Sequence, residues 1–506
     1  MKSIVKIFSS VAVVGGIVAF AGCTNKFPDY NTDQYALRAE SPSLVIPSMI
    51  ESMMYAQQNS SQMADQMVGS LGGYFTNVNR WQGANFDTFN VSDGWNTSVY
   101  DQAFQAVYSN YFKVEDLTEG EGHWFAFATL VKAASMMRVT DCYGPIPYSQ
   151  VRDGDMYVAY DNGEDVYRNI IDDLLSSADV LYQYSAQVGL SPIGNSDPIY
   201  GGNYANWAKL GVSLAMRAAM RAGFADDFVR AVNMECGYIS ANQENALLDP
   251  KTQGNPYQLA ASSWGDLRIN ASITDYMNGY NDPRLPLYFT AATQGNVTYQ
   301  GIRMGQPANF DKSSGTPFSQ PNFLASDKMP VCVAAEVQFL LAEAALRGWI
   351  GGDAKAYYEA GIAMSFEQWG AQGASAYMAD AESTPADHTD FLSQTYNRNT
   401  DVKIAWDAET TAERHLEQII TQKWIANFPM GLEGWADYRR TGYPELCESV
   451  SVNESGATIH SIKDYRRLRY PYTEESLNPD NYAAAVQGLG GADAESTPLF
   501  WQGKGI

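Results

Sequence analysis

The sequence predicts a mainly α-helical protein in which paired helices carry long, loop-rich insertions. Apolar residues recur at intervals of three and four in several long stretches, the spacing of amphipathic helices. Small residues stand where two helices would approach closely, as in tetratricopeptide units, namely Ala342, Ala344, Ala345 and Gly361. Segments rich in Gly, Asn, Ser and Pro separate the helical stretches, so the pairs follow no fixed period.

Composition limits the class of protein and of ligand. A chain of 506 residues with 45% hydrophobic content can bury a large core, and 13% aromatic residues exclude a disordered acidic tail. The formal net charge of −24 opposes binding to nucleic acids and to anionic membrane surfaces. A neutral or cationic ligand fits this charge better, although an acidic balance also serves solubility alone.

The N-terminus has the pattern of a lipoprotein signal peptide over residues 1–22. Two lysines precede the apolar run from Ile7 to Ala21, which is too short for an easy bilayer crossing. Small residues then precede Cys23, with Phe20 at the usual leucine position, so Cys23 is expected to carry the lipid. The alternative is an ordinary, cleaved signal peptide. A flexible tether over 23–40 and one domain over 41–506 follow.

The remaining cysteines show no metal-binding or redox spacing. They are isolated in sequence and lie in or beside apolar segments, at Cys142, Cys236, Cys332 and Cys447. We expect four buried free thiols, while three full disulfide pairings stay open. Neither a metal nor a cofactor is predicted.

Helical stripes can be followed along the chain. The predicted helices run through 124–138, 167–181, 207–221 and 337–345, and Asp353 would cap a further helix that reaches Met364. From Thr411 to Pro444, apolar residues at helical spacing and then Pro429 and Gly431 predict a helical hairpin that buries Trp424 and Trp435.

Three insertions, at about 72–100, 237–328 and 372–401, interrupt the helices. The first is polar and aromatic. The second places Trp264 in a polar loop and contains a turn near which Asp282 and Arg284 are expected to form an ion pair or a cap. The third is rich in carboxylates without calcium-loop spacing and is predicted to be a solvated loop.

Flat rings beside amide and guanidinium groups suit a sugar, which stacks its C–H face and hydrogen-bonds through its hydroxyl edges. The candidate ligand-binding residues, all chosen from their loop settings, are Trp81, Trp264, Tyr74, Tyr257, Asn77, Asn79 and Arg80. For Trp264, packing beneath its loop is an equally good interpretation.

Several segments resemble the SusD/RagB family of nutrient-binding outer membrane lipoproteins. They are QKWIANFPMGLEGWADYRRTGYP (422–444), YRRLRYP (465–471), NPDNYAAAV (478–486), RVTDCYGPIPYS (138–149) and NDPRLP (281–286). The resemblance implies a SusD-like fold, in which four tetratricopeptide-like helix pairs form a scaffold with a loop-rich ligand-binding layer. It also implies a lipid-anchored protein on the extracellular face of the outer membrane that serves a SusC-like TonB-dependent transporter.

Catalysis is not expected, because the nucleophile-elbow, zinc-protease, phosphate-loop and dinucleotide motifs are missing from the sequence. The leading interpretation is a binding protein for an extracellular oligosaccharide. Two alternatives stay open: a peptide-binding relative in the same family, and a structural lid on the transporter without ligand affinity of its own.

Overall fold

The structure is a computed structural model that describes residues 41–51, 53, 68–79, 85–152, 154, 156–188, 193–307, 310–452 and 459–506. These residues belong to one compact unit, Ser41–Ile506. The predicted signal peptide, the tether and Cys23 lie outside the described residues. Within the described part, no helix has the length and apolar character needed to cross a membrane.

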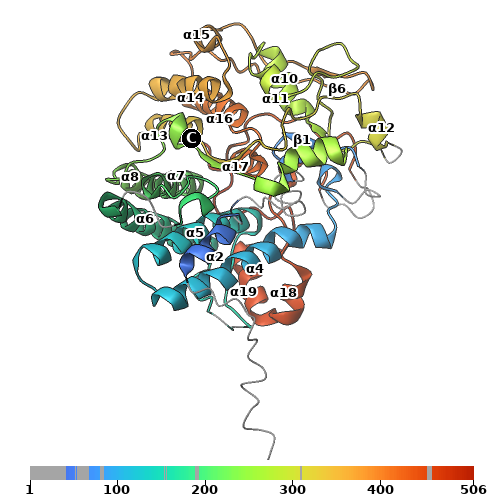
Figure 1. Cartoon of the computed structure of the whole chain (residues 1–506). Helices are drawn as coiled ribbons and strands as arrows, with labels where there is room; N and C mark the ends of the chain where they lie inside the picture. The colour runs from blue at the N-terminus through green and yellow to red at the C-terminus, as the bar shows by residue number, and fades with distance from the viewer. Residues whose placement is uncertain are drawn as a thin grey trace, which may run out of the picture. The chain divides into compact units, whose positions relative to one another are not determined.

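Four successive helix pairs form the helical scaffold of the described part (Figure 1). They are α4 (Asp93–Thr118) with α5 (Gly122–Tyr143), α6 (Gly163–Val188) with α7 (Tyr204–Ala222), α13 (Ala334–Leu346) with α14 (Ala354–Trp369), and α16 (Ala412–Ala426) with α17 (Gly431–Thr441). The helix α2 (Pro42–Glu51) packs on α4 and α5, and α5 packs on α6. The predicted mainly helical architecture is confirmed.

Local sequence signals begin and end these helices. Ser92, Asp353 and Thr411 accept hydrogen bonds from backbone N–H groups of the first turns of α4, α14 and α16, as N-cap residues do. Gly442 ends α17 in the left-handed region at φ 84°. The predicted Asp353 cap is confirmed, and α17 begins at Gly431, directly after Pro429 and Met430.

The hairpin of α16 and α17 lies in the core, as predicted. Trp424 is 1% exposed and Trp435 is fully buried. The indole nitrogen of Trp424 donates to the carbonyl of Gly72 at 2.7 Å, and the Tyr74 ring stacks on the Trp424 ring. The hairpin therefore supports the first polar loop directly.

A buried ionic network joins the helix pairs. Arg217 of α7 donates to both carboxylate oxygens of Glu336 in α13, at 2.8 and 2.6 Å. Arg221, one turn further along α7, pairs with Asp141 of α5 and with Glu433 of α17. Four helices thus share compensated charges, and α16 joins them as the fifth through Lys423, which donates to Asp437 at 2.7 Å.

The remaining helices are short. They are α8 (Ala225–Val232), α9 (Pro256–Gln258), α10 (Ala271–Gly279), α11 (Leu285–Tyr288), α12 (Lys312–Gly315), α15 (Ala374–Met378), α18 (Tyr472–Leu477) and α19 (Pro479–Leu489). Single-turn 3-10 or π segments are η2 (Val68–Ser70), η4 (Phe86–Thr88), η5 (Gly194–Ser196), η6 (Asn242–Glu244), η7 (Lys251–Gln253), η8 (Leu259–Ser263) and η9 (Ile462–Asp464). Most lie in the insertions, which are more ordered than the sequence suggests.

The described residues form three small antiparallel sheets, of which two join segments distant in sequence, and none was predicted. The strand β1 (Phe75–Asn77) pairs with β3 (Leu267–Ile269), with Phe75 opposite Ile269. The strand β2 (Ala246–Leu248) pairs with β4 (Met329–Cys332), and β5 (His388–Thr389) pairs with β6 (Thr395–Tyr396). Strands of two to four residues are too short to show the alternation of apolar and polar residues by which a strand is predicted.

Two expectations about the insertions need correction. The first insertion becomes helical at Asp93, where α4 begins, because Ser92 caps the helix there. The third is not wholly solvated: His388 and Asp390 are buried, and they form ion pairs. By contrast, the predicted Asp282–Arg284 pair is confirmed, with both side chains fully buried and 2.6 Å between the two groups.

The four cysteines of the described part are buried free thiols, as predicted. Burial raises the pKa of Cys447 to about 12 and that of Cys236 to about 11. Both are therefore protonated and poorly nucleophilic at neutral pH.

Candidate functional site

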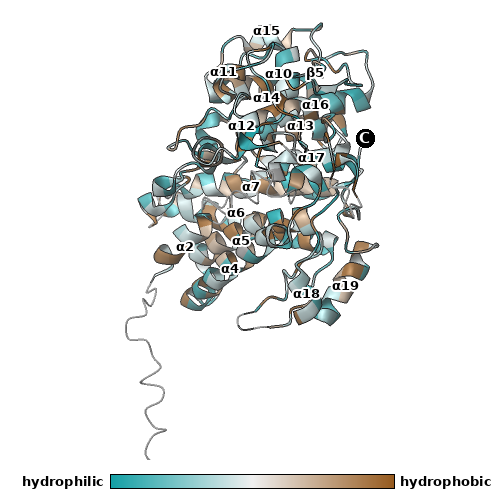
Figure 2. Cartoon of the chain, turned by 90° about the vertical axis from the view of Figure 1, so that its right-hand side faces the viewer, coloured by the Kyte–Doolittle hydropathy of each residue, from teal (hydrophilic) through white to brown (hydrophobic). Residues whose placement is uncertain are grey.

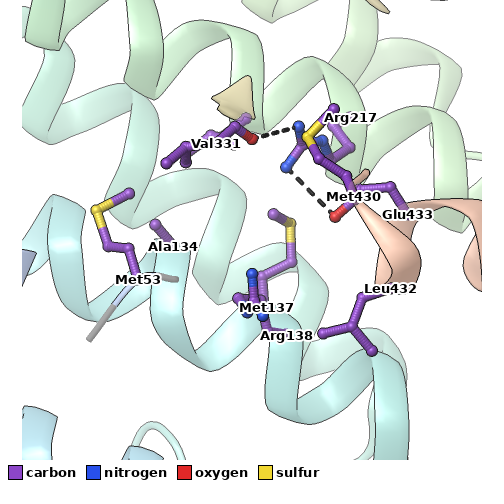
Figure 3. A pocket seen from close by; sticks show the side chains of 10 residues that line it. Met53, Ala134, Met137, Arg138, Arg217, Val331, Met430, Leu432 and Glu433 are labelled. Carbon is purple, nitrogen blue, oxygen red and sulfur yellow. Dashed lines mark hydrogen bonds and ion pairs between the residues drawn. The ribbon is translucent and has the colours of Figure 1, made fainter. Parts of the chain in front are cut away.

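One cavity in the described part is internal and small. It lies among α5, α7 and α17 and holds about 20 Å³ (Figure 3). Methionine side chains and the guanidinium of Arg217 point into it, and Arg217 donates there to the carbonyl of Val331 at 2.8 Å. This volume has room for about one water molecule, so the cavity does not take a nutrient.

The two loops in which the sequence places candidate residues are brought together by β1 and β3. The strand β1 lies in the first insertion and leads to Asn79, while β3 lies in the second and follows Trp264. A further bond, from the Val78 amide to the Asp266 carbonyl at 2.8 Å, extends the ladder past the strands. The pairing therefore places Asn79 and Trp264 on neighbouring segments.

A polar cluster forms where these segments meet. The Asn79 side-chain amide donates to the Asp266 carboxylate at 3.1 Å, and the Lys312 ammonium pairs with the same carboxylate. Lys312 also donates to the carbonyl of Trp264 at 2.8 Å. The Lys312 side chain is 46% exposed, so solvent reaches the cluster, which we call the loop site: Asn79, Trp264, Asp266 and Lys312.

Local backbone geometry presents Trp264 at this place. The π segment Leu259–Ser263 ends there, and the Trp264 amide donates to the Leu259 carbonyl at 3.0 Å. Gly265 then turns the chain with φ 70°, a conformation that favours glycine. Trp264 is half-buried between exposed Ser263 and the turn, so this large ring is partly open to solvent.

Two of the predicted ligand-stacking rings belong to the core instead. Tyr74 is fully buried, donates from its hydroxyl to the Trp424 carbonyl at 2.6 Å and stacks on the Trp424 ring. Tyr257 is 1% exposed and stacks on Phe75 with 5.4 Å between ring centroids. Their ring faces are covered by protein, so the expectation that they stack on a ligand is corrected to a packing role.

Asn77 is likewise committed to the protein. It is 2% exposed, its backbone amide donates to one Asp87 carboxylate oxygen at 2.9 Å, and its side-chain amide donates to the other at 2.7 Å. Because both bonds hold the end of β1 in place, the predicted ligand contact of Asn77 is corrected to a structural role. Arg80 and Trp81 lie outside the described residues.

Sequence reasoning missed Asp266 and Lys312. Asp266 stands two residues after Trp264, so its place in the same polar run was a usable signal. Lys312 comes from α12, far along the second insertion, and no local pattern connects it with Asn79 or Trp264.

An apolar layer supports the loop site from beneath. Val78, Ile302 and Phe318 are buried together, and Phe391 and Leu392 of the third insertion pack against them. The third insertion is fixed in turn by His388, whose ring lies between Asp275 at 3.1 Å and Asp390 at 3.5 Å. Burial alone lowers the His388 pKa, but its hydrogen bonds to these carboxylates raise it to about 9, so the imidazole is charged at neutral pH.

The chain matches the family model described as Susd and RagB outer membrane lipoprotein over residues 26–502. No curated protein is similar enough to be matched. Among solved structures, a SusD homolog from Bacteroides uniformis is 35% identical, with a TM-score of 0.87 over 92% of this chain and 99% of that one.

Two further solved structures are similar to the same extent. A SusD-like protein from Bacteroides thetaiotaomicron is 33% identical, with a TM-score of 0.86 over 92% of this chain and 99% of that one. A chitin-binding SusD homolog from Flavobacterium johnsoniae is 32% identical, with a TM-score of 0.86 over 91% of this chain and 98% of that one.

Proposed function

This chain belongs to the SusD-like family of outer membrane lipoproteins, and from that premise we propose that it binds an extracellular oligosaccharide and delivers it to a SusC-like TonB-dependent transporter. The family consists of non-catalytic, nutrient-binding lipoproteins, and the predicted SusD-like fold is confirmed by the solved relatives. In this proposal Cys23 carries the lipid that holds the protein on the extracellular face of the outer membrane.

The half-buried Trp264 beside a solvent-reached polar cluster is the observation that carries the sugar assignment. The ring supplies an apolar face, and Asp266, Asn79 and Lys312 supply acceptors and donors for hydroxyl groups within the same few residues. We include Trp81 and Arg80 in this site because they directly follow Asn79 in the chain. The chitin-binding relative supports the same ligand class.

Non-covalent capture followed by release suits contacts of this kind. A few hydrogen bonds and one or two stacked rings correspond to a Kd on the micromolar scale, about 8 kcal/mol. Binding at this strength retains a glycan at the surface and still lets the transporter remove it.

Isothermal titration with chitohexaose, maltoheptaose, xylohexaose and a pool of oligopeptides tests the proposal. We expect one oligosaccharide to bind and Trp264→Ala to weaken it at least fivefold. Trp349→Ala is the matched control, because Trp349 is also half-buried but packs on Phe228 near α13 and α14. Unchanged affinity in both Trp264→Ala and Trp81→Ala would remove the site assignment.

The two alternatives give different results in the same experiments. A peptide-binding protein would titrate with the oligopeptides and with none of the glycans. A structural lid would bind neither ligand and would still co-purify with the transporter from solubilised outer membranes. Incorporation of a labelled fatty acid into the wild-type protein, but not into Cys23→Ala, tests the anchor separately.

A further inference from the structure

A second pocket lies far from the loop site, between the first turn of α4 and the segment that leads into α18. Its volume is about 200 Å³. Its lining residues are Asp93, Asn96, Thr97, Arg469, Tyr470, Pro471, Tyr472, Glu475, Tyr482 and Asp493, and we call it the α4–α18 pocket. Figures 1 and 2 both place α18 and α19 toward the lower end of the unit and α12, which carries Lys312, toward the upper part.

Two residues that line this pocket each carry a buried oxygen without a hydrogen-bond partner among the described residues. The two oxygens are Oδ1 of Asn96, a residue 3% exposed, and Oγ1 of Thr97, a residue 8% exposed. The Asn96 side chain is not free to turn away, because its Nδ2 donates to the Arg469 carbonyl at 2.7 Å. Buried polar atoms are normally satisfied, so both oxygens can receive or share the hydroxyl protons of a bound molecule.

The rim of the pocket offers an aromatic face. Tyr472, the first residue of α18, is 68% exposed, which is unusual for a ring of its size. By contrast, the ring of Tyr470 packs edge-on against Tyr160 and Tyr482. Tyr472 is therefore placed to cover one face of a small ring that enters the pocket.

The charges in the pocket select against anions. Three carboxylates line it, from Asp93, Glu475 and Asp493, against one guanidinium, from Arg469. Arg469 pairs with Asp93 at 3.7 Å and with Glu495 at 2.6 Å, and Asp493 pairs with Arg467. The four carboxylates of Asp93, Glu475, Asp493 and Glu495 still outnumber these two guanidinium groups, so the net negative charge repels phosphate, sulfate and carboxylate ligands.

The carboxylates are arranged for hydrogen bonding rather than for metal binding. Asp493 is held in place by the Tyr470 amide and the Tyr482 hydroxyl, both at 3.2 Å, and by Arg467. Among the described residues, no three His, Cys, Asp or Glu side chains come close enough together to hold a metal ion. These bonds use both acceptor sites of Asp493 Oδ1 and one of Oδ2, so Oδ2 keeps one acceptor site for a hydroxyl group of a polyol.

We infer that the α4–α18 pocket binds one neutral sugar ring, independently of the loop site. An exposed ring, the fixed Asp493 carboxylate and unsatisfied amide and hydroxyl oxygens together match a molecule with an apolar face and hydroxyl edges. The volume is below the roughly 300–1,000 Å³ of pockets that enclose drug-sized ligands, so it admits a single ring. This pocket and the loop site share no residue, so the inference shares only the ligand class with the proposed function.

Saturation-transfer NMR on the full acylated chain, in a sugar-free zwitterionic detergent, tests this inference. The probes are the methyl glycosides of glucose, galactose, mannose, xylose and N-acetylglucosamine, with glucuronic acid as the anionic comparison. We expect at least one neutral glycoside to bind saturably, and Tyr472→Ala to weaken it at least tenfold. Tyr157→Ala is the matched control, because Tyr157 is 67% exposed and does not line the pocket.

A second variant separates binding from folding. Thr97→Val keeps the side-chain shape and removes an unpaired buried hydroxyl, so we expect binding at least threefold weaker with a thermal midpoint that is unchanged or raised. Trp264→Ala should leave the Tyr472-dependent signal intact even if it abolishes oligosaccharide binding at the loop site.

Three results would overturn the inference: no saturable glycoside signal, a signal equally strong in Tyr472→Ala, or a preference for glucuronic acid over every neutral glycoside. None of them bears on the loop site, whose failure shows only in the Trp264 and Trp81 titrations. The two proposals therefore fail separately.

Discussion

Glu343 of α13 provides a direct test of whether the buried ionic network stabilises the helix scaffold. Its carboxylate is 1% exposed and accepts hydrogen bonds from Arg440 at 2.5 and 2.7 Å and from Arg347 at 2.9 Å. Burial alone raises the Glu343 pKa, but the charge and hydrogen bonds of Arg440, with Arg347, outweigh burial and lower it to about 2. Relative to 4.5, the folded state favours the carboxylate by about 3 kcal/mol.

Glu343→Gln removes this charge and leaves the buried guanidinium of Arg440 and the half-buried guanidinium of Arg347 without it. We expect the free energy of unfolding at pH 7 to fall by about 3–5 kcal/mol. A carboxyl group with a lowered folded-state pKa stabilises above pH 4.5, and this contribution is lost as the pH falls toward 2. The difference between wild type and variant should therefore shrink by about 2 kcal/mol between pH 7 and pH 3.

Urea unfolding followed by tryptophan fluorescence at pH 7, 5 and 3 measures both effects. Glu359→Gln on α14 is the matched control, because its partner Lys355 lies 3.7 Å away at the surface with both side chains substantially exposed. That exposed pair should contribute about 0.5 kcal/mol or less. The reasoning is refuted if Glu343→Gln stays within about 1 kcal/mol of wild type at pH 7, or if the difference is the same at pH 3.

Three further outcomes follow from the same contacts. His388→Gln should flatten the decline in thermal midpoint between pH 6.5 and about 9. The raised pKa of His388 stabilises the folded state below pH 6.5, and this stabilisation is lost as the pH rises toward 9. A parallel decline in both proteins would contradict the pairing of charged His388 with Asp275 and Asp390. Gly72→Ala should destabilise by about 1–3 kcal/mol in urea, since its new Cβ lies 2.5 Å from the Gly431 carbonyl, whereas Gly351→Ala, with open space around it, should not. Tyr74→Phe should lower the free energy of unfolding by about 1 kcal/mol and leave the affinity for glycan unchanged in titration. A weaker affinity would return Tyr74 to the ligand-binding site.

The helices were predictable because each long helix repeats its apolar stripe over several turns. The stripe around Trp424 and the cap at Asp353 illustrate this, since both depend only on residues a few positions apart. The small sheets were not predictable, because β1 and β3 contribute three residues each and their pairing depends on tertiary contacts. The buried pairing of His388 with Asp275 was hidden for the same reason.

The loop site was predictable only in part. An aromatic residue among polar neighbours has the same signature whether its ring is exposed or buried, and Tyr74 and Trp264 fall on opposite sides of that distinction. Tyr74 is buried because the core residue Trp424, distant in sequence, offers its ring face and carbonyl. Lys312 reaches Trp264 only after the second insertion has folded back on itself.

The pairing of Phe75 with Ile269 also constrains how the protein acquires its ligand affinity. Closing the loop between Phe75 and Ile269 costs chain entropy, and this cost is offset only when the intervening helices have packed. Nascent chains that stop before β3 therefore lack the Trp264, Asp266 and Lys312 side of the proposed loop site. The chain can therefore bind a nutrient only after translation has passed the middle of the polypeptide. A short excised fragment should not bind it.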